Sequence, residues 1–105
     1  MSDFIQIQCT CPSEDEAAKI VDVLVAERLV ACVQILGPIR SVYRWQGNVE
    51  RSQEYLCLMK TRKTLFEAVS QQIRSLHSYQ CPELVATEIV AGSVDYLKWL
   101  REETQ

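Results

Sequence analysis

The 105-residue sequence predicts an α+β fold in which helices cover one face of an antiparallel sheet. Three observations predict it. Segments with apolar residues at every second position, typical of strands, alternate with segments whose apolar spacing is helical. Their order along the chain is β-α-β-β-α-β-α. Two consecutive strands are joined by a short turn and form a hairpin. With right-handed crossovers, this order gives a split-βαβ, ferredoxin-like sandwich, which we expect to be one domain over residues 1–105.

The first strand is expected over Phe4–Thr10, where apolar and polar residues alternate, and Pro12-Ser13 ends it. Ser13 followed by Glu16 has the pattern of a capping box, so a helix should begin here. The residues that follow at helical spacing are Ala17, Ile20, Val21, Leu24 and Arg28.

The centre of the chain predicts a long hairpin over Ile39–Thr61. It is preceded by a strand over Ala31–Leu36, interrupted at Gly37-Pro38, where we expect a bulge or a bend. The loop of the hairpin is expected at Gln46-Gly47, because a loop one residue further on would place two arginines opposite each other.

The returning strand of this hairpin, Asn48–Lys60, is too long for the domain that contains it. At about 3.3 Å per residue it would span roughly 43 Å, against a diameter of roughly 33 Å for a compact domain of this length. Its second half is also apolar on both faces, with Leu56 and Leu58 on one and Tyr55, Cys57 and Met59 on the other. One of these faces needs a partner, so we expect an oligomer.

A second helix should begin with the capping box Thr64/Glu67 and end near His77. Its apolar stripe consists of Phe66, Val69, Ile73 and Leu76. A loop over Ser78–Glu83 follows, because Pro82 favours an extended conformation for the residue before it.

The last strand is expected over Leu84–Val90. Gly92-Ser93 should end it and cap a C-terminal helix, whose apolar residues are Val94, Leu97 and Leu100.

Composition narrows the classes of function. The net charge of −3 and the pI near 5.1 argue against nucleic acid as a partner, since phosphate binding needs a basic face. The apolar residues are too evenly spread for a membrane span. The N-terminus lacks the features of an export signal, and the odd number of five cysteines has no scaffold-like spacing. These features predict a reduced, cytoplasmic protein.

Cys9 and Cys11 stand two residues apart at a strand end, so their thiols share a face and could hold a soft ion such as Cu(I). The alternative is that Cys9 is a small apolar residue of the core, and for Cys9 alone we favour it. His77, the only histidine, opens a segment that ends in Glu83, and both residues are candidate metal ligands. The alternative for His77 is a solvated residue at a helix end.

Tyr43 and Trp45, with Tyr55, form a predicted aromatic patch along the hairpin. The patch could line a ligand cleft, but we favour a contact between subunits, where aromatic residues are enriched. Lys60 and Glu83 could form an ion pair or an anion-binding point.

Several motifs together resemble the CutA family of divalent-cation tolerance proteins, and the resemblance runs nearly end to end. They are Thr10-x-Pro12-Ser13, Glu27-Arg28-Leu29-Val30-Ala31-Cys32-Val33, Tyr43-Arg44-Trp45-Gln46-Gly47, Lys60-Thr61, His77-x-Tyr79-x-x-Pro82-Glu83, Gly92 and Tyr96-Leu97-x-Trp99-Leu100. The resemblance implies a homotrimer related to PII signalling proteins, with long hairpins joining edges between subunits. The expected cleft or interface residues are Tyr43, Trp45, Lys60, Tyr79 and Trp99.

The resemblance also implies a role in copper and divalent-metal tolerance. The copper site attributed to bacterial members uses a cysteine, matched by Cys9, and a His-His pair. His77 matches the second histidine of that pair, but Leu76 stands at the first. Either Cys11 replaces this ligand or copper binding is weak. In a split-βαβ fold the ends of the first strand and the second helix need not be adjacent, so the site also depends on how the loop after His77 folds.

The leading expectation is therefore a trimeric, non-enzymatic protein of copper and divalent-cation homeostasis. The alternative is a PII-like module that binds a small anionic metabolite in subunit clefts through Lys60, Arg44 and backbone amides. An acylphosphatase-like enzyme would need an arginine in the loop after the first strand, where this chain has Cys11-Pro12-Ser13.

Overall fold

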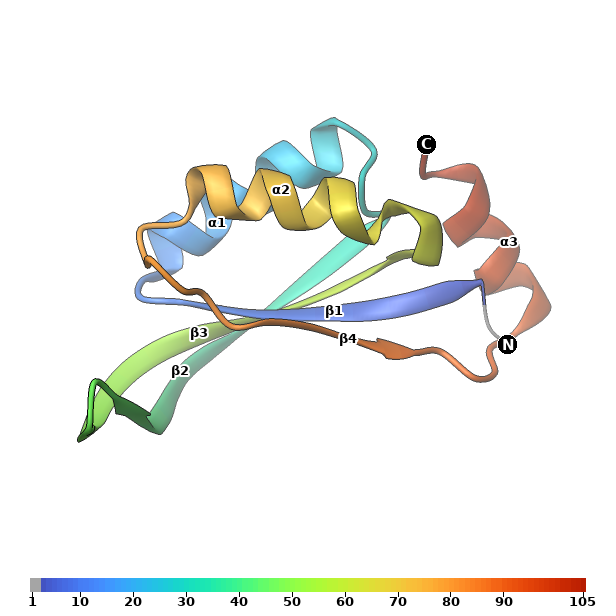
Figure 1. Ribbon diagram of the computed structural model, residues 1–105. Helices are drawn as coiled ribbons and strands as arrows, with labels where there is room; N and C mark the ends of the chain where they lie inside the picture. The colour runs from blue at the N-terminus through green and yellow to red at the C-terminus, as the bar shows by residue number, and fades with distance from the viewer. Residues whose placement is uncertain (1–2) are drawn as a thin grey trace.

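The computed structural model describes residues 3–105 and contains a four-stranded antiparallel sheet in the order β2-β3-β1-β4. The strands and helices are β1 (Phe4–Cys11), α1 (Glu14–Ala26), β2 (Cys32–Trp45), β3 (Asn48–Arg62), the 3-10 turn η1 (Lys63–Leu65), α2 (Phe66–Leu76), β4 (Leu84–Glu88) and α3 (Val94–Glu102). This order and pairing confirm the predicted ferredoxin-like fold (Figure 1).

α1 and α2 lie side by side over one face of the sheet, whereas α3 lies at its end (Figure 1). The expectation that the helices share one face therefore holds for α1 and α2 only. At the sheet end, the Tyr96 hydroxyl of α3 lies 3.3 Å from the Cys32 sulfur. The Arg101 guanidinium stacks 5.0 Å above the ring of Phe4. No described helix is long and apolar enough to cross a membrane.

The core lies between the sheet and the α1–α2 layer, because alternate residues of β1 and β3 point toward these helices. The fully buried core residues, each 0–1% exposed, include Ile7, Cys9, Cys11, Ile20, Leu24, Cys57, Met59, Val69 and Ile73. On the opposite face, Leu56 and Leu58 remain partly accessible, and Leu36 and Val85 are 43% and 50% exposed. One apolar face of the sheet is thus covered, and the other is open.

The hairpin has the length and the loop that the sequence predicts. Trp45 pairs with Asn48, so the loop is Gln46-Gly47, and both loop residues have positive φ angles, 51° and 84°. Such a two-residue loop suits the right-handed twist of the flanking strands. The chain extends 44 Å along its longest axis and 25 × 23 Å across it. The hairpin projects beyond the body covered by the helices (Figure 1).

A bulge, rather than a strand end, occurs at Gly37-Pro38. Leu36 pairs with Leu56 and Ile39 with Glu54, so two residues of β2 oppose the single residue Tyr55. This confirms the expected irregularity, but β2 continues through it to Trp45.

The extra residue of the bulge reverses the alternation of side chains along β2. Tyr43 and Trp45 consequently lie on the face of Glu54 and Leu56, whereas Tyr55 points to the face of the helices and packs against the core. The predicted aromatic patch therefore keeps Tyr43 and Trp45 and loses Tyr55.

Three local expectations were wrong. Thr64 lies inside η1 and caps nothing, and α2 begins without a side-chain cap. Arg28 lies beyond α1 with φ 59°, and its guanidinium donates to the carbonyl oxygens of Glu102 and Glu103. β4 ends at Glu88, two residues early. The caps at Ser13 and Ser93 are confirmed by backbone N–H groups that donate to their hydroxyls.

Candidate metal centre and neighbouring pocket

The end of β1 and the end of α2 meet at a cluster of two thiols and an imidazole. The sulfur atoms of Cys9 and Cys11 and a ring nitrogen of His77 all lie within 4.8 Å of one another. Both cysteines are fully buried, and the side chain of His77 has no exposed surface. The structure thus brings together three of the four predicted metal ligands on the helix side of the sheet.

Hydrogen bonds on both ring nitrogens fix the position and tautomer of His77. Nε2 lies 2.7 Å from the carbonyl oxygen of Thr10, so it carries the proton and donates to that oxygen. Nδ1 accepts from the backbone N–H of Tyr79 at 3.0 Å. Glu16 Oε2 lies 3.4 Å from Nδ1 and accepts from the N–H and the hydroxyl of Ser78. In this arrangement Nδ1 acts as an acceptor, as a ring nitrogen that binds a metal must.

A third buried thiol, Cys57 of β3, lies beside the cluster. Cys57 pairs directly with Cys9 across the β1–β3 ladder. Hydrogen bonds from the thiols of Cys57 and then Cys9, with a further contribution from His77, hold the pKa of Cys11 far below its usual range. The same hydrogen bonds, followed by burial, raise the pKa of Cys9 and of Cys57. Of the three thiols, Cys11 therefore loses its proton most readily, and the thiolate is the form that binds metal.

These donors fit a soft metal ion. Sulfur and nitrogen ligands around one tetrahedral ion lie about 3.8 Å apart. A separation within 4.8 Å therefore needs a contraction of roughly 1 Å or less. The ion would also displace one of the two hydrogen bonds of His77, because both ring nitrogens are engaged. Thiolate and imidazole suit Cu(I) and Zn²⁺ better than Mg²⁺ or Ca²⁺.

Glu83, the fourth predicted ligand, lies away from the thiols. Its carboxylate accepts from Gln8 Nε2 at 2.9 Å, and Gln8 points to the open face of the sheet. Lys60 donates to Gln34 at 2.7 Å. No ion pair between Lys60 and Glu83 is found among residues 3–105.

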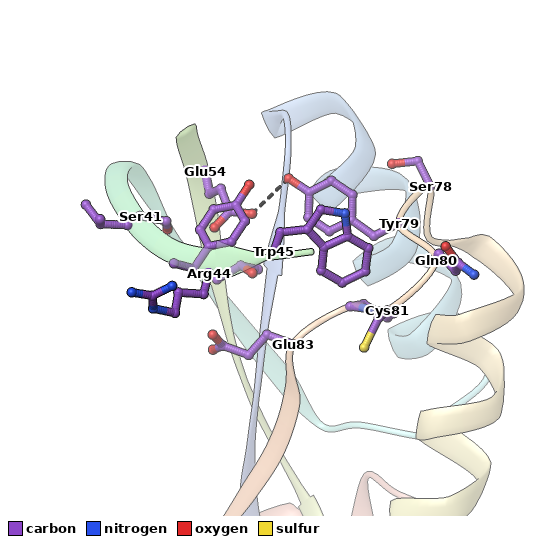
Figure 2. A pocket seen from close by; sticks show the side chains of 13 residues that line it. Ser41, Arg44, Trp45, Glu54, Ser78, Tyr79, Gln80, Cys81 and Glu83 are labelled. Carbon is purple, nitrogen blue, oxygen red and sulfur yellow. Dashed lines mark hydrogen bonds between the residues drawn. The ribbon is translucent and has the colours of Figure 1, made fainter. Parts of the chain in front are cut away.

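A pocket of about 760 Å³ lies between the hairpin and the loop that joins α2 to β4. Three of the predicted cleft residues, Tyr43, Trp45 and Tyr79, line it, together with Thr10, Glu54 and Glu83 (Figure 2). Trp99, by contrast, packs against Tyr96 on α3, with ring centroids 5.6 Å apart, and does not line this pocket.

The pocket and the thiol cluster lie back to back. Because side chains alternate along β1, Cys9 and Cys11 point to the helices, whereas Thr10 between them points to the pocket. The rings of His77 and Tyr79 lie 4.9 Å apart and connect the two sites.

Inside the pocket, the Tyr79 hydroxyl donates to Glu54 Oε2 at 2.8 Å, as the dashed line in Figure 2 shows. Glu54 is only 5% exposed. Burial and then the hydrogen bond to Glu54 raise the pKa of Tyr79, so its hydroxyl stays protonated near neutral pH.

Comparison with known proteins decides the family. The family model described as CutA1 divalent ion tolerance protein matches residues 5–103. The chain belongs to this family. The resemblance seen in the sequence is thereby confirmed.

The divalent-cation tolerance protein CutA of Thermus thermophilus is 47% identical over 95 residues, covering 90% of this chain and 92% of the relative. The chloroplastic protein CutA of Arabidopsis thaliana is 38% identical over 101 residues; the match covers 96% of this chain, which spans only 56% of that relative. A solved structure of the Thermus thermophilus protein has a TM-score of 0.95 at 44% identity, covering 97% of this chain and 99% of that one.

Two site residues of this CutA1 family member, Cys57 and Glu54, could not be predicted from the sequence. Cys57 has no site signal in the sequence, because the sequence does not give the register that places it opposite Cys9. Glu54 has no site signal either, since a glutamate on a hairpin is usually solvated. Its burial depends on the folding of the loop around Tyr79 against the hairpin, which has no local sequence signal.

Proposed function

We propose that this protein acts in divalent-cation tolerance by binding copper, without catalysing a reaction. The observation that carries the proposal is the meeting of Cys9, Cys11 and His77 within 4.8 Å in a buried site. Membership of the CutA1 family supports the tolerance role. Copper is the cargo here, so binding and seclusion of the ion would suffice for tolerance.

The donor set favours Cu(I) over Cu(II). The pKa of Cys11 is lowered, which favours its thiolate, and Cys9 and Cys57 supply further sulfur beside it. Soft thiolates select Cu(I), whereas imidazole also suits Cu(II). Leu76 stands where the resemblance expects a histidine, and its side chain is 42% exposed. In this proposal Cys11 takes the place of the missing imidazole as a ligand.

The test is competition for Cu(I) with a chromophoric chelator under reducing conditions. Cys9→Ser and Cys11→Ser should each weaken the affinity at least about tenfold, or roughly 1.4 kcal/mol. His77→Ala should weaken Cu(II) binding more than Cu(I) binding. Cys81→Ser is the matched control, because Cys81 is exposed and outside the cluster.

A buried serine could also destabilise the fold, so Cys9→Ala and Cys11→Ala are measured in parallel, with the unfolding midpoint of each variant. A folded Cys9→Ala/Cys11→Ala variant that binds Cu(I) as tightly as the wild type would refute the site.

We further propose that the protein is a homotrimer. The open face of the sheet carries Leu36, Leu56, Leu58 and Val85, and the hairpin projects beyond its own body. Both features are explained if neighbouring copies cover them. Sedimentation should show a trimer, and Leu58→Glu should dissociate it, because a charge would replace a leucine in the contact. A folded wild-type monomer at micromolar concentration would contradict the proposal.

The arrangement within one protomer gives no support to an anionic metabolite held by Lys60 and Arg44. Arg44 pairs with Val49 near the hairpin tip, whereas Lys60 lies eleven residues further along β3. This separation is roughly 36 Å along the strand. Only a neighbouring copy could bring the two cations together, and a nucleotide panel on the assembled protein would detect such a site. A cytoplasmic location, expected from the thiols and the N-terminus, stays a prediction.

A further inference from the structure

We propose that the pocket between the hairpin and the α2–β4 loop binds a small organic cation that carries an ammonium group. This site would be separate from the thiol cluster, because the two open on opposite faces of the sheet. Three features support the proposal: aromatic walls, carboxylates without a basic partner, and a cavity of suitable size.

The walls are aromatic on two sides. Trp45 and Tyr43 come from β2, and Tyr79 comes from the α2–β4 loop; all three line the pocket (Figure 2). Trp45 and Tyr43 are 42% and 40% exposed in the single protomer, so their faces are open to a ligand or to a neighbouring copy. Aromatic faces attract cations, and tryptophan does so most strongly.

The charged groups of the pocket also favour a cation. Glu54 is 5% exposed, and its carboxylate accepts a hydrogen bond from Tyr79. Glu83 accepts one from Gln8. Within residues 3–105, no lysine or arginine lies at ion-pair distance from either carboxylate. A carboxylate this deeply buried is normally paired with a positive charge, so a cationic ligand would supply what the protomer does not.

Arg44 is the basic residue of the pocket rim, and it does not reverse this preference. Its guanidinium points away from Trp45 and Tyr79 in Figure 2. The charged residues that line the pocket are Glu54, Glu83 and Arg44, which give two negative groups and one positive group. This balance disfavours a phosphate or a carboxylate ligand.

The volume is compatible with a small molecule. At about 760 Å³ the pocket falls within the usual range for ligand sites. A bare metal ion would need convergent oxygen, nitrogen or sulfur atoms, but the metal-type cluster found among the described residues is the thiol cluster on the other face. Aromatic rings suit a ligand with a hydrocarbon surface around its charge.

The experiment uses the assembled protein in the Trp99→Phe background, in which Trp45 is the single tryptophan. Tetramethylammonium and butylammonium are titrated while the fluorescence of Trp45 is recorded, and calorimetry repeats the measurement without a fluorophore. 2,2-Dimethylpropan-1-ol serves as a neutral probe of similar size, and inorganic phosphate serves as the anion. We expect saturable binding of an ammonium ion, with at least tenfold weaker binding of the alcohol and of phosphate.

Glu54→Gln keeps the shape of the side chain and an oxygen that accepts from Tyr79, but removes the charge. It should weaken ammonium binding at least tenfold, or about 1.4 kcal/mol. Glu67→Gln is the matched control: it removes the same charge from an exposed position on α2 and should leave binding unchanged.

Three outcomes would overturn the proposal. The first is no saturation by either ammonium ion up to 10 mM, roughly 2.7 kcal/mol of binding free energy. The second is equal affinity for the alcohol. The third is an effect of Glu54→Gln on subunit dissociation alone, which would mean that a neighbouring copy fills the pocket. None of these outcomes bears on copper binding, because the cysteines are unchanged in every variant.

Discussion

Replacing Tyr79 by phenylalanine tests how the α2–β4 loop is held against the hairpin. Tyr79→Phe keeps the ring that contacts His77 and removes only the hydroxyl that donates to Glu54 at 2.8 Å. Hydrogen bonds to charged groups contribute about 1.5–3 kcal/mol. Tyr79 is partly exposed, so water can replace some of the lost bond, and we expect about 1.5 kcal/mol of destabilisation. With a urea m-value of about 1.5 kcal/mol/M, the midpoint should fall by about 1 M at fixed protein concentration.

The same variant makes a prediction about pH. Burial and the hydrogen bond to Glu54 raise the pKa of Tyr79 in the folded state, so that state binds the phenolic proton more tightly than the unfolded chain does. This contribution is fully present below about pH 10, the ordinary pKa of tyrosine, and is lost as the pH rises through the folded-state pKa. The stability difference between the wild type and Tyr79→Phe should therefore narrow above about pH 10.

Tyr43→Phe is the control for both measurements. Its hydroxyl accepts from Ser52 at 3.3 Å on the exposed part of the hairpin, and its removal should change stability by less than about 0.5 kcal/mol. If Tyr79→Phe unfolds at the same urea concentration as Tyr43→Phe, the bond to Glu54 does not hold the loop, and the reasoning fails.

Two further pairs of variants test the local structure, each by urea denaturation. Ser13→Ala removes the cap of α1 and should lower the free energy of unfolding by about 1 kcal/mol. Thr64→Ala removes no cap and should change it by less than about 0.5 kcal/mol. Equal losses of stability in the two variants would contradict the assignment of the caps. Gly37→Ala would place a Cβ atom against the ring of Tyr55 and should cost about 1–3 kcal/mol. In Gly47→Ala the added Cβ atom meets no neighbour, but the residue must keep φ at 84°, so we expect about 1–2 kcal/mol of backbone strain. An unchanged urea midpoint in either glycine variant would refute the explanation given for that variant.

Most of the fold could be predicted, because it depends on periodicity and on local turn chemistry. The alternation in β1, the caps at Ser13 and Ser93, and the Gln46-Gly47 loop each have a sequence signal within a few residues. The cap at Thr64 shows the limit of such signals. Its motif fits a capping box, but β3 runs on to Arg62 and the chain enters α2 through a 3-10 turn.

The candidate site was predictable in its members but not in its geometry. Cys9, Cys11 and His77 were singled out by residue type, and their meeting depends on contacts between segments more than sixty residues apart. The separation of Glu83 from the thiols follows from strand alternation, which places it with Gln8 on the opposite face of the sheet. That could be seen only once the pairing of β1 with β4 was known.

The bulge at Gly37-Pro38 makes the chemistry of the pocket depend on a single inserted residue. Without it, the alternation of β2 would continue from Leu36, and Arg40 and Arg44 would stand on the face of Glu54. Tyr43 and Trp45 would then point the other way. One insertion thus exchanges a basic row for an aromatic row without any substitution. Changes in length at this position would alter ligand chemistry in one step, whereas the covered core would meet the change only through Tyr55, the residue opposite the bulge.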